Sequence, residues 1–69
     1  MNTEFELTNE YIELIRLLKL LRLVESGGQA KLAVDQGLVT VNGQTEYRKR
    51  AKLRKGDLVQ FDGAEIRIR

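Results

Sequence analysis

The change in hydrophobic period that decides the fold lies in one segment, Gly37-Leu38-Val39-Thr40-Val41-Asn42-Gly43. Before Gly37 apolar residues recur every three or four positions, which is typical of a helix, and after it they alternate, which is typical of a strand. Glycine at the point of change is a common helix stop. Asn-Gly is the strongest short-range signal for a type I′ hairpin, because both of its residues need positive φ. The segment therefore predicts a helix, then a strand, then a tight turn.

A first helix is predicted from Tyr11 to Val24, where apolar residues form a stripe wide enough to be buried around most of the helix. Thr8 or Asn9 is the expected N-cap, because both side chains can accept a backbone N–H. Upstream, Phe5 and Leu7 alternate with polar residues, which indicates a short strand with one buried face.

A second helix is predicted from Ser26 to Gly37. Ser26 and Gln29 have the spacing of a capping box. The stripe that faces the first helix consists of small residues, Ala30, Ala33, Val34 and Gly37. Between the helices, Gly27-Gly28 has two interpretations: a tight turn that lets the helices approach closely, or a phosphate site at a helix start. We favour the turn.

The C-terminal half is predicted to be strands. The return strand of the first hairpin is Gln44 to Tyr47, and Lys55-Gly56-Asp57 indicates a turn. A second hairpin follows, with strands Leu58 to Phe61 and Glu65 to Ile68 around Asp62-Gly63. The expected fold class is α+β, with two packed helices on a small, mostly antiparallel sheet. The length of 69 residues predicts one domain, residues 1–69.

Composition excludes several kinds of function. The chain contains no cysteine, which excludes disulfides and thiolate chemistry. It also contains no histidine, which is the commonest general acid or base and the commonest zinc ligand. We therefore expect no enzyme activity, no metal and no organic cofactor. No segment is apolar enough to cross a membrane, and the acidic start does not resemble a secretory signal. The expected location is the cytoplasm.

The strongest feature for function is a basic run. Net charge is only +2, yet six of the twelve basic residues fall within the eight positions 48–55. Such a run is often only a solvated loop. Here the apolar Leu53 is expected to anchor it against the core, so that Arg48, Lys49, Arg50 and Lys52 face outward together. A fixed group of ammonium and guanidinium groups is an electrostatic footprint for nucleic acid.

Aromatic residues argue against binding of single strands. Phe5, Tyr11 and Phe61 are expected in the core, and Tyr47 alone borders the basic run. The simplest interpretation of Tyr47 is a strand residue that packs on its neighbours. Without a stacking platform, recognition of folded RNA by charge and shape is more consistent with the sequence.

The order of these parts resembles the alpha-L RNA-binding motif, the domain named after ribosomal protein S4. The resemblance covers residues 12–61 and depends on the segment from Gly37 to Gly43 combined with Lys55-Gly56-Asp57. More narrowly, Leu18-Lys19-Leu20 followed by Ser26-Gly27-Gly28-Gln29-Ala30-Lys31 is similar to a stand-alone bacterial subgroup of YbcJ-like and YaaA-like proteins.

The resemblance implies an RNA-binding surface built from the start of the second helix and the loop after the Asn-Gly hairpin. The residues at those places are Ser26, Gln29, Lys31, Arg48, Lys49, Arg50 and Lys52. Two positions depart from the family pattern: Gly27 replaces an arginine, and Glu13-Leu14-Ile15 replaces Arg-Leu-Asp. Contacts made by those family residues are not transferred to this chain.

Two hypotheses follow from the sequence. The first is non-catalytic binding of structured RNA by a monomer, with ribosomal and transfer RNA as the candidate classes. The second is a protein-interaction module whose basic loop docks an acidic partner.

Overall fold

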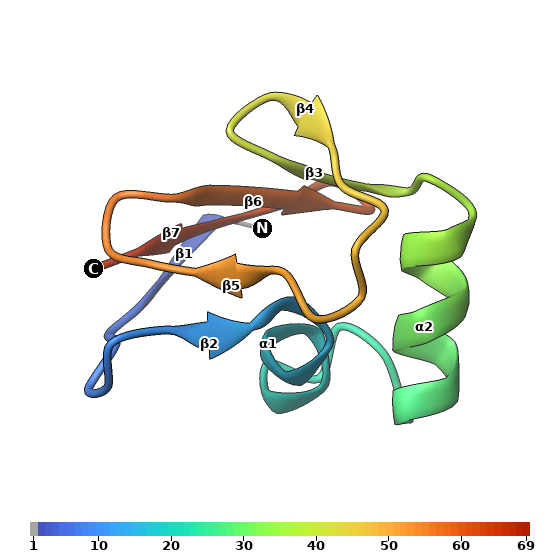
Figure 1. Ribbon diagram of the computed structural model, residues 1–69, viewed down its shortest axis with the longest axis horizontal. Helices are drawn as coiled ribbons and strands as arrows, with labels where there is room; N and C mark the ends of the chain where they lie inside the picture. Colours follow the sequence, from blue (N-terminus) through green and yellow to red (C-terminus); the bar gives the residue numbers. More distant parts are fainter. Residues whose placement is uncertain (1) are drawn as a thin grey trace.

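The protein is described by a computed structural model that covers residues 2–69 (Figure 1). Its elements, in chain order, are β1 Asn2–Phe5, β2 Ile12–Glu13, α1 Leu14–Leu20, α2 Gly27–Asp35, β3 Val39–Val41, β4 Gln44–Thr45, β5 Lys52–Leu53, β6 Leu58–Phe61 and β7 Ala64–Ile68. A five-stranded sheet has the order β1-β7-β6-β3-β4, and β2 pairs with β5 in a separate two-stranded sheet. All pairings are antiparallel except β1 with β7. The predicted class, two helices packed on a mostly antiparallel sheet, is confirmed.

The elements with strong local signals form as predicted. The Ser26 hydroxyl oxygen accepts the Gln29 N–H at 3.1 Å and caps α2. At the other end Gly37 adopts φ +73°, and its N–H donates to the Val34 carbonyl. The hairpin turn at Asn42-Gly43 has positive φ at both residues, as a type I′ turn requires.

Helix α1 is shorter than predicted at both ends. It begins at Leu14, because Ile12–Glu13 is drawn into a strand paired with β5. The Leu14 and Ile15 N–H groups donate to the carbonyls of Ala51 and Lys49, at 2.9 and 3.2 Å. Helix α1 is therefore capped by a distant loop, and the prediction of a Thr8 or Asn9 cap is wrong.

The C-terminal end of α1 is closed by a Schellman motif around Arg22. Arg22 has φ +58°, and its N–H donates to the Lys19 carbonyl at 3.0 Å. The Leu23 N–H donates to the Leu18 carbonyl, also at 3.0 Å. This pattern normally uses glycine at the left-handed position, so the sequence carries no obvious stop there.

Three strands also differ from expectation. β1 lies at Asn2–Phe5, ahead of the position predicted from Phe5 and Leu7, and it pairs in parallel with β7. The return strand β4 ends at Thr45 instead of Tyr47. The basic connection expected to be irregular contains β5.

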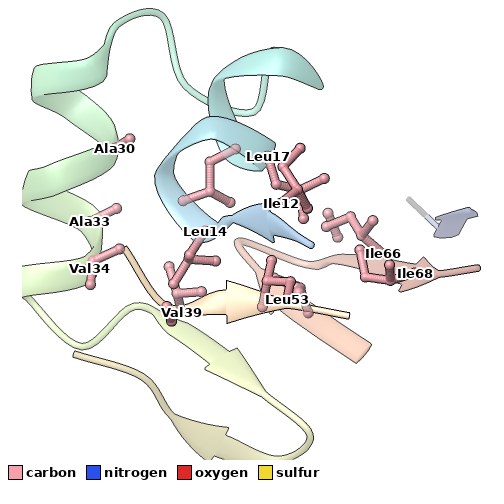
Figure 2. Packing of buried hydrophobic residues seen from close by; sticks show 14 of the residues in the cluster. Ile12, Leu14, Leu17, Ala30, Ala33, Val34, Val39, Leu53, Ile66 and Ile68 are labelled. Carbon is pink, nitrogen blue, oxygen red and sulfur yellow. The ribbon is translucent and has the colours of Figure 1, made fainter. Parts of the chain in front are cut away.

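The core lies between the helices and the inner face of the sheet, and Figure 2 shows Ala30, Ala33 and Val34 of α2 turned toward it. Leu53 is 1% exposed, so the predicted anchor of the basic loop is buried. Phe5 and Phe61 are half-buried and pack against the core. The prediction of a buried Tyr11 is wrong, because 38% of this residue is exposed.

A side-chain latch joins the Asn-Gly hairpin to the Lys-Gly-Asp turn. The Asn42 amide donates to a carboxylate oxygen of Asp57 at 3.0 Å, and the Asn42 amide oxygen accepts the Leu58 N–H at 2.9 Å. The second carboxylate oxygen of Asp57 accepts the Arg54 N–H at 2.8 Å. The two most recognisable sequence segments therefore hold each other in place.

Candidate nucleic-acid interface

The loop between β4 and β5, residues 46–51, has a fixed backbone. Two of its carbonyls cap α1, as described above, and the Ala51 N–H donates to the Arg48 carbonyl at 3.1 Å. Ala51 and Leu53 turn into the core. Because the apolar side chains point inward, the basic residues around them are directed to the surface.

Arg48 is held by an acid two residues away. Its Nε and Nη2 atoms donate to the two carboxylate oxygens of Glu46, each at 3.0 Å, and its N–H donates to the same group. These hydrogen bonds hold the pKa of the Glu46 carboxyl below its ordinary value, although partial burial acts in the opposite direction. The carboxylate in turn raises the pKa of the Arg48 guanidinium. A phosphate at Arg48 has to compete with Glu46.

Lys49 connects the loop to α2. Its ammonium nitrogen lies 3.2 Å from a carboxylate oxygen of Asp35. Lys31 lies one helical turn before Asp35, on the same side of α2. Lys31 therefore lies on the side of α2 that carries the contact to the loop. Asp35 could not be assigned to the basic run from sequence spacing, because it stands in α2, far from the run along the chain.

Two further bases gather on Tyr11. The Lys52 ammonium lies 4.9 Å from the centre of the Tyr11 ring, and the Arg54 guanidinium carbon lies 5.9 Å from it. Both positions are suited to cation–π attraction. Arg50 is exposed and forms no ion pair among residues 2–69. Arg54 thus adds a basic side chain that the sequence prediction of the site left out.

Ser26 and Gln29 both serve the helix start. Besides the Ser26 cap, the Gln29 side-chain oxygen accepts the Glu25 N–H at 2.7 Å. The glycines that follow Ser26 are not needed for close packing. A Cβ at Gly27 would meet no atom within 4 Å, and one at Gly28 would meet only the Ser26 hydroxyl. The interpretation of Gly27-Gly28 as a device for close helix approach is wrong.

The predicted site residues therefore lie in three places, one of which holds Arg50 and Lys52, both exposed and without an ion pair among residues 2–69. Lys31, Lys49 and Arg48 surround the junction of α2 and the loop, each exposed in part and two of them paired with acids. Ser26 and Gln29 form the cap at the other end of α2. The structure describes no cluster of carboxylates within residues 2–69 that could hold a metal ion, and no helix there is long and apolar enough to span a membrane.

Comparison with known proteins assigns the family. The family model of the S4 domain matches residues 5–69. The chain belongs to the S4 domain family. The match is longer than the resemblance over residues 12–61 and extends to β7 and to Phe5, the last residue of β1, which pairs with Ile68 of β7 in this S4 domain.

Relatives of this S4 domain include two bacterial proteins of similar length. It is 45% identical over 58 residues to "Putative RNA-binding protein YbcJ" of Escherichia coli (strain K12), covering 84% of this chain and 83% of the relative. It is 35% identical over 63 residues to "Probable ribosome maturation protein RlbA" of Bacillus subtilis (strain 168), covering 91% and 89%. These matches support the predicted likeness to YbcJ-like bacterial proteins.

A solved structure confirms the motif. The solution structure of Escherichia coli YbcJ, described as revealing an alfaL motif involved in RNA-binding, is similar to this S4 domain with a TM-score of 0.71. The two share 42% sequence identity, and the match covers 94% of this chain and 84% of YbcJ. The predicted alpha-L architecture is therefore established.

Proposed function

We propose that this S4 domain binds structured RNA without catalysing a reaction on it, as one RNA-binding unit. The observation that carries the proposal is the anchored loop, whose backbone caps α1 and whose basic side chains point outward beside α2. The names of the YbcJ relative and of its solution structure support RNA as the ligand. The name of the Bacillus subtilis relative favours ribosomal RNA over transfer RNA.

The contacts would be made mainly to phosphates. Arg50, Lys52 and Lys31 offer charges that no acid neutralises among residues 2–69, whereas Arg48 and Lys49 must first leave Glu46 and Asp35. Fixed bases on a rigid loop bind a polyanion with little ordering cost. Phosphate contacts position a protein on RNA, and shape then selects among folded RNAs.

The exposed tyrosines support a preference for folded RNA. The Tyr11 ring is already covered by Lys52 and Arg54. Tyr47 is 64% exposed, but its ring lies close to the backbone of Gly37, where a Cβ would stand 3.0 Å from its hydroxyl. With Tyr11 covered, Tyr47 is a single ring, whereas successive bases of a single strand stack on several aromatic side chains.

The test is binding of a fluorescent RNA hairpin in competition with an unstructured RNA of equal length, measured over a range of salt. With about four phosphate contacts the log–log salt slope should be roughly −3 to −4. In Arg50→Ala combined with Lys52→Ala, and separately in Lys31→Ala, the slope should flatten by about one unit for each basic side chain removed. Arg67→Ala is the matched control, because Arg67 is an exposed base on the outer face of β7.

Two results would reject the proposal. Equal competition by the hairpin and the unstructured RNA would contradict binding by shape. Unchanged affinity and slope in the loop and Lys31 variants would remove this surface from the RNA site and favour an acidic protein partner.

A further inference from the structure

A second basic surface lies on α1, away from the β4–β5 loop. The side of α1 that faces the core carries Leu14, Leu17 and Leu18. At the helical spacing of 100° per residue, Arg16 and Lys19 lie on the opposite, exposed side. Arg22, which closes the helix, is also exposed. Together they are all the bases of residues 1–25.

These three bases share one depression. Arg16, Lys19 and Arg22 line a shallow hollow between α1 and the start of α2, together with Leu20 and Gly27. Glu13 is the one acid in its lining. None of the three bases takes part in an ion pair among residues 2–69, unlike Arg48 and Lys49 of the loop. The hollow is therefore net positive and its charges are free to meet a ligand.

The spacing forms a row of charges. Arg16 and Lys19 are separated by about 4.5 Å along the axis of α1, and Arg22 follows in the turn that closes the helix, so the three bases succeed one another along this side of the molecule. The first turn of α1 touches the basic loop through the Leu14 and Ile15 N–H groups, and Arg22 ends the helix. The row of bases therefore leads from the end of α1 that the basic loop caps to the end that Arg22 closes, along a helix whose seven residues span about 10 Å.

The backbone conformation of Arg22 also supports a role for its side chain. Among residues 2–69, three non-glycine residues have positive φ: Arg22, Asn42 and Asp62. Asparagine and aspartate tolerate this conformation. Arginine tolerates it less well, and glycine would close the same Schellman motif without strain. The fold does not require an arginine at this strained backbone position, which suggests that the arginine side chain has a use of its own.

We propose that Arg16, Lys19 and Arg22 form a second phosphate-binding surface, so that one RNA contacts both ends of α1. This inference rests on the proposed function. A phosphate backbone fits better than an apolar partner, because Leu20, 55% exposed, is the only large apolar side chain fully open at the hollow and it stands among cations. A row of free charges is suited to a polyanion, whose charges repeat.

Arg22→Gly is the decisive variant, because the two roles of Arg22 move different observables in different directions. Removal of the strain should raise the melting temperature. Removal of the charge should weaken hairpin RNA binding about fivefold at 0.15 M salt and flatten the salt slope by about one unit. Arg16→Ala combined with Lys19→Ala should flatten the slope by about two units. Arg67→Ala is again the control.

The outcomes separate this proposal from the function on which it rests. If Arg22→Gly and the Arg16–Lys19 variant bind RNA like the parent while the Arg50–Lys52 variant does not, the second surface is rejected and the proposed function stands. If the parent does not bind hairpin RNA, both are rejected. If the α1 variants keep RNA affinity but lose binding to a polyglutamate peptide, the surface serves an acidic protein and the proposal is overturned.

Discussion

The latch between Asn42 and the Asp57 turn should be worth a large part of the stability of this small domain. The substitution Asn42→Gly removes both side-chain hydrogen bonds, to Asp57 and from Leu58, while glycine still adopts the φ of +54° found at this position. Each such bond contributes about 0.5–1.5 kcal/mol net, so the expected loss is about 1–3 kcal/mol. A domain of 69 residues has a total stability of about 3.5–10 kcal/mol.

The measurement is urea and thermal unfolding of Asn42→Gly beside Asn42→Ala. Each kcal/mol of stability removed should lower the melting temperature by about 4–8 °C for a domain of this size. Alanine should cost more than glycine, by about 1–2 kcal/mol, because its Cβ is strained at positive φ. The matched control is Asn9→Gly, since Asn9 is exposed and no side-chain hydrogen bond is seen for it among residues 2–69.

Two results would refute this reasoning. Equal unfolding midpoints for Asn42→Gly and Asn9→Gly would show that the latch contributes nothing beyond the entropy of glycine. An unchanged midpoint with a collapse of RNA affinity would make Asn42 an RNA contact, and the structural interpretation of the Asn-Gly and Lys-Gly-Asp segments would fall.

Three shorter predictions test the cap, the anchor and the loop ion pair. Ser26→Ala should cost about 1 kcal/mol and speed amide exchange at Gln29; unaltered exchange would deny the cap. Leu53→Ala should cost about 2–5 kcal/mol in urea unfolding, and a cost typical of a surface site would deny the anchor. Because Arg48 depresses the pKa of Glu46, the pair stabilises the fold above the ordinary pKa of 4.5 and this contribution is lost as pH falls through the depressed value. Glu46→Gln should therefore be less stable than the parent at pH 7 and equal to it in acid, and it should bind RNA more tightly by freeing Arg48; a stability gap that widens in acid would contradict this.

The sequence predicted correctly those elements whose signals are local. Ser26 and Gln29 stand three residues apart and interact with each other, and Asn42-Gly43 needs only its own backbone to turn. Such elements are decided within a few residues. The same holds for α2, whose stop at Gly37 uses the residue type that its conformation favours.

The errors fall where distant residues decide. α1 begins where carbonyls of Lys49 and Ala51, far along the chain, meet its N–H groups, and it ends at an arginine in a conformation that usually takes glycine. The contact of Tyr11 with Lys52 forms only when β2 and β5 pair. No periodicity within one segment contains this information.

The same limit applies to the candidate site. Its basic loop could be found from charge density alone, because six bases in eight positions stand out in any sequence. Asp35, which pairs with Lys49 of this loop, could not be found from the sequence, since only the fold brings α2 to the loop. The bases of α1 were visible but looked like the ordinary polar side of a helix until their shared hollow was known.

The parallel pairing of β1 with β7 affects the order in which the chain folds. Asn2 pairs with Glu65, and beyond the strand the Arg69 N–H donates to the Phe5 carbonyl at 2.9 Å. The other strands and both helices of residues 2–69 lie between these two strands in the chain. Such long-range pairing closes late, because the loop entropy must be overcome before any contact forms. Until β7 docks, β1 is an unpaired strand carrying Phe5, so the folding chain is exposed to wrong pairing along this edge.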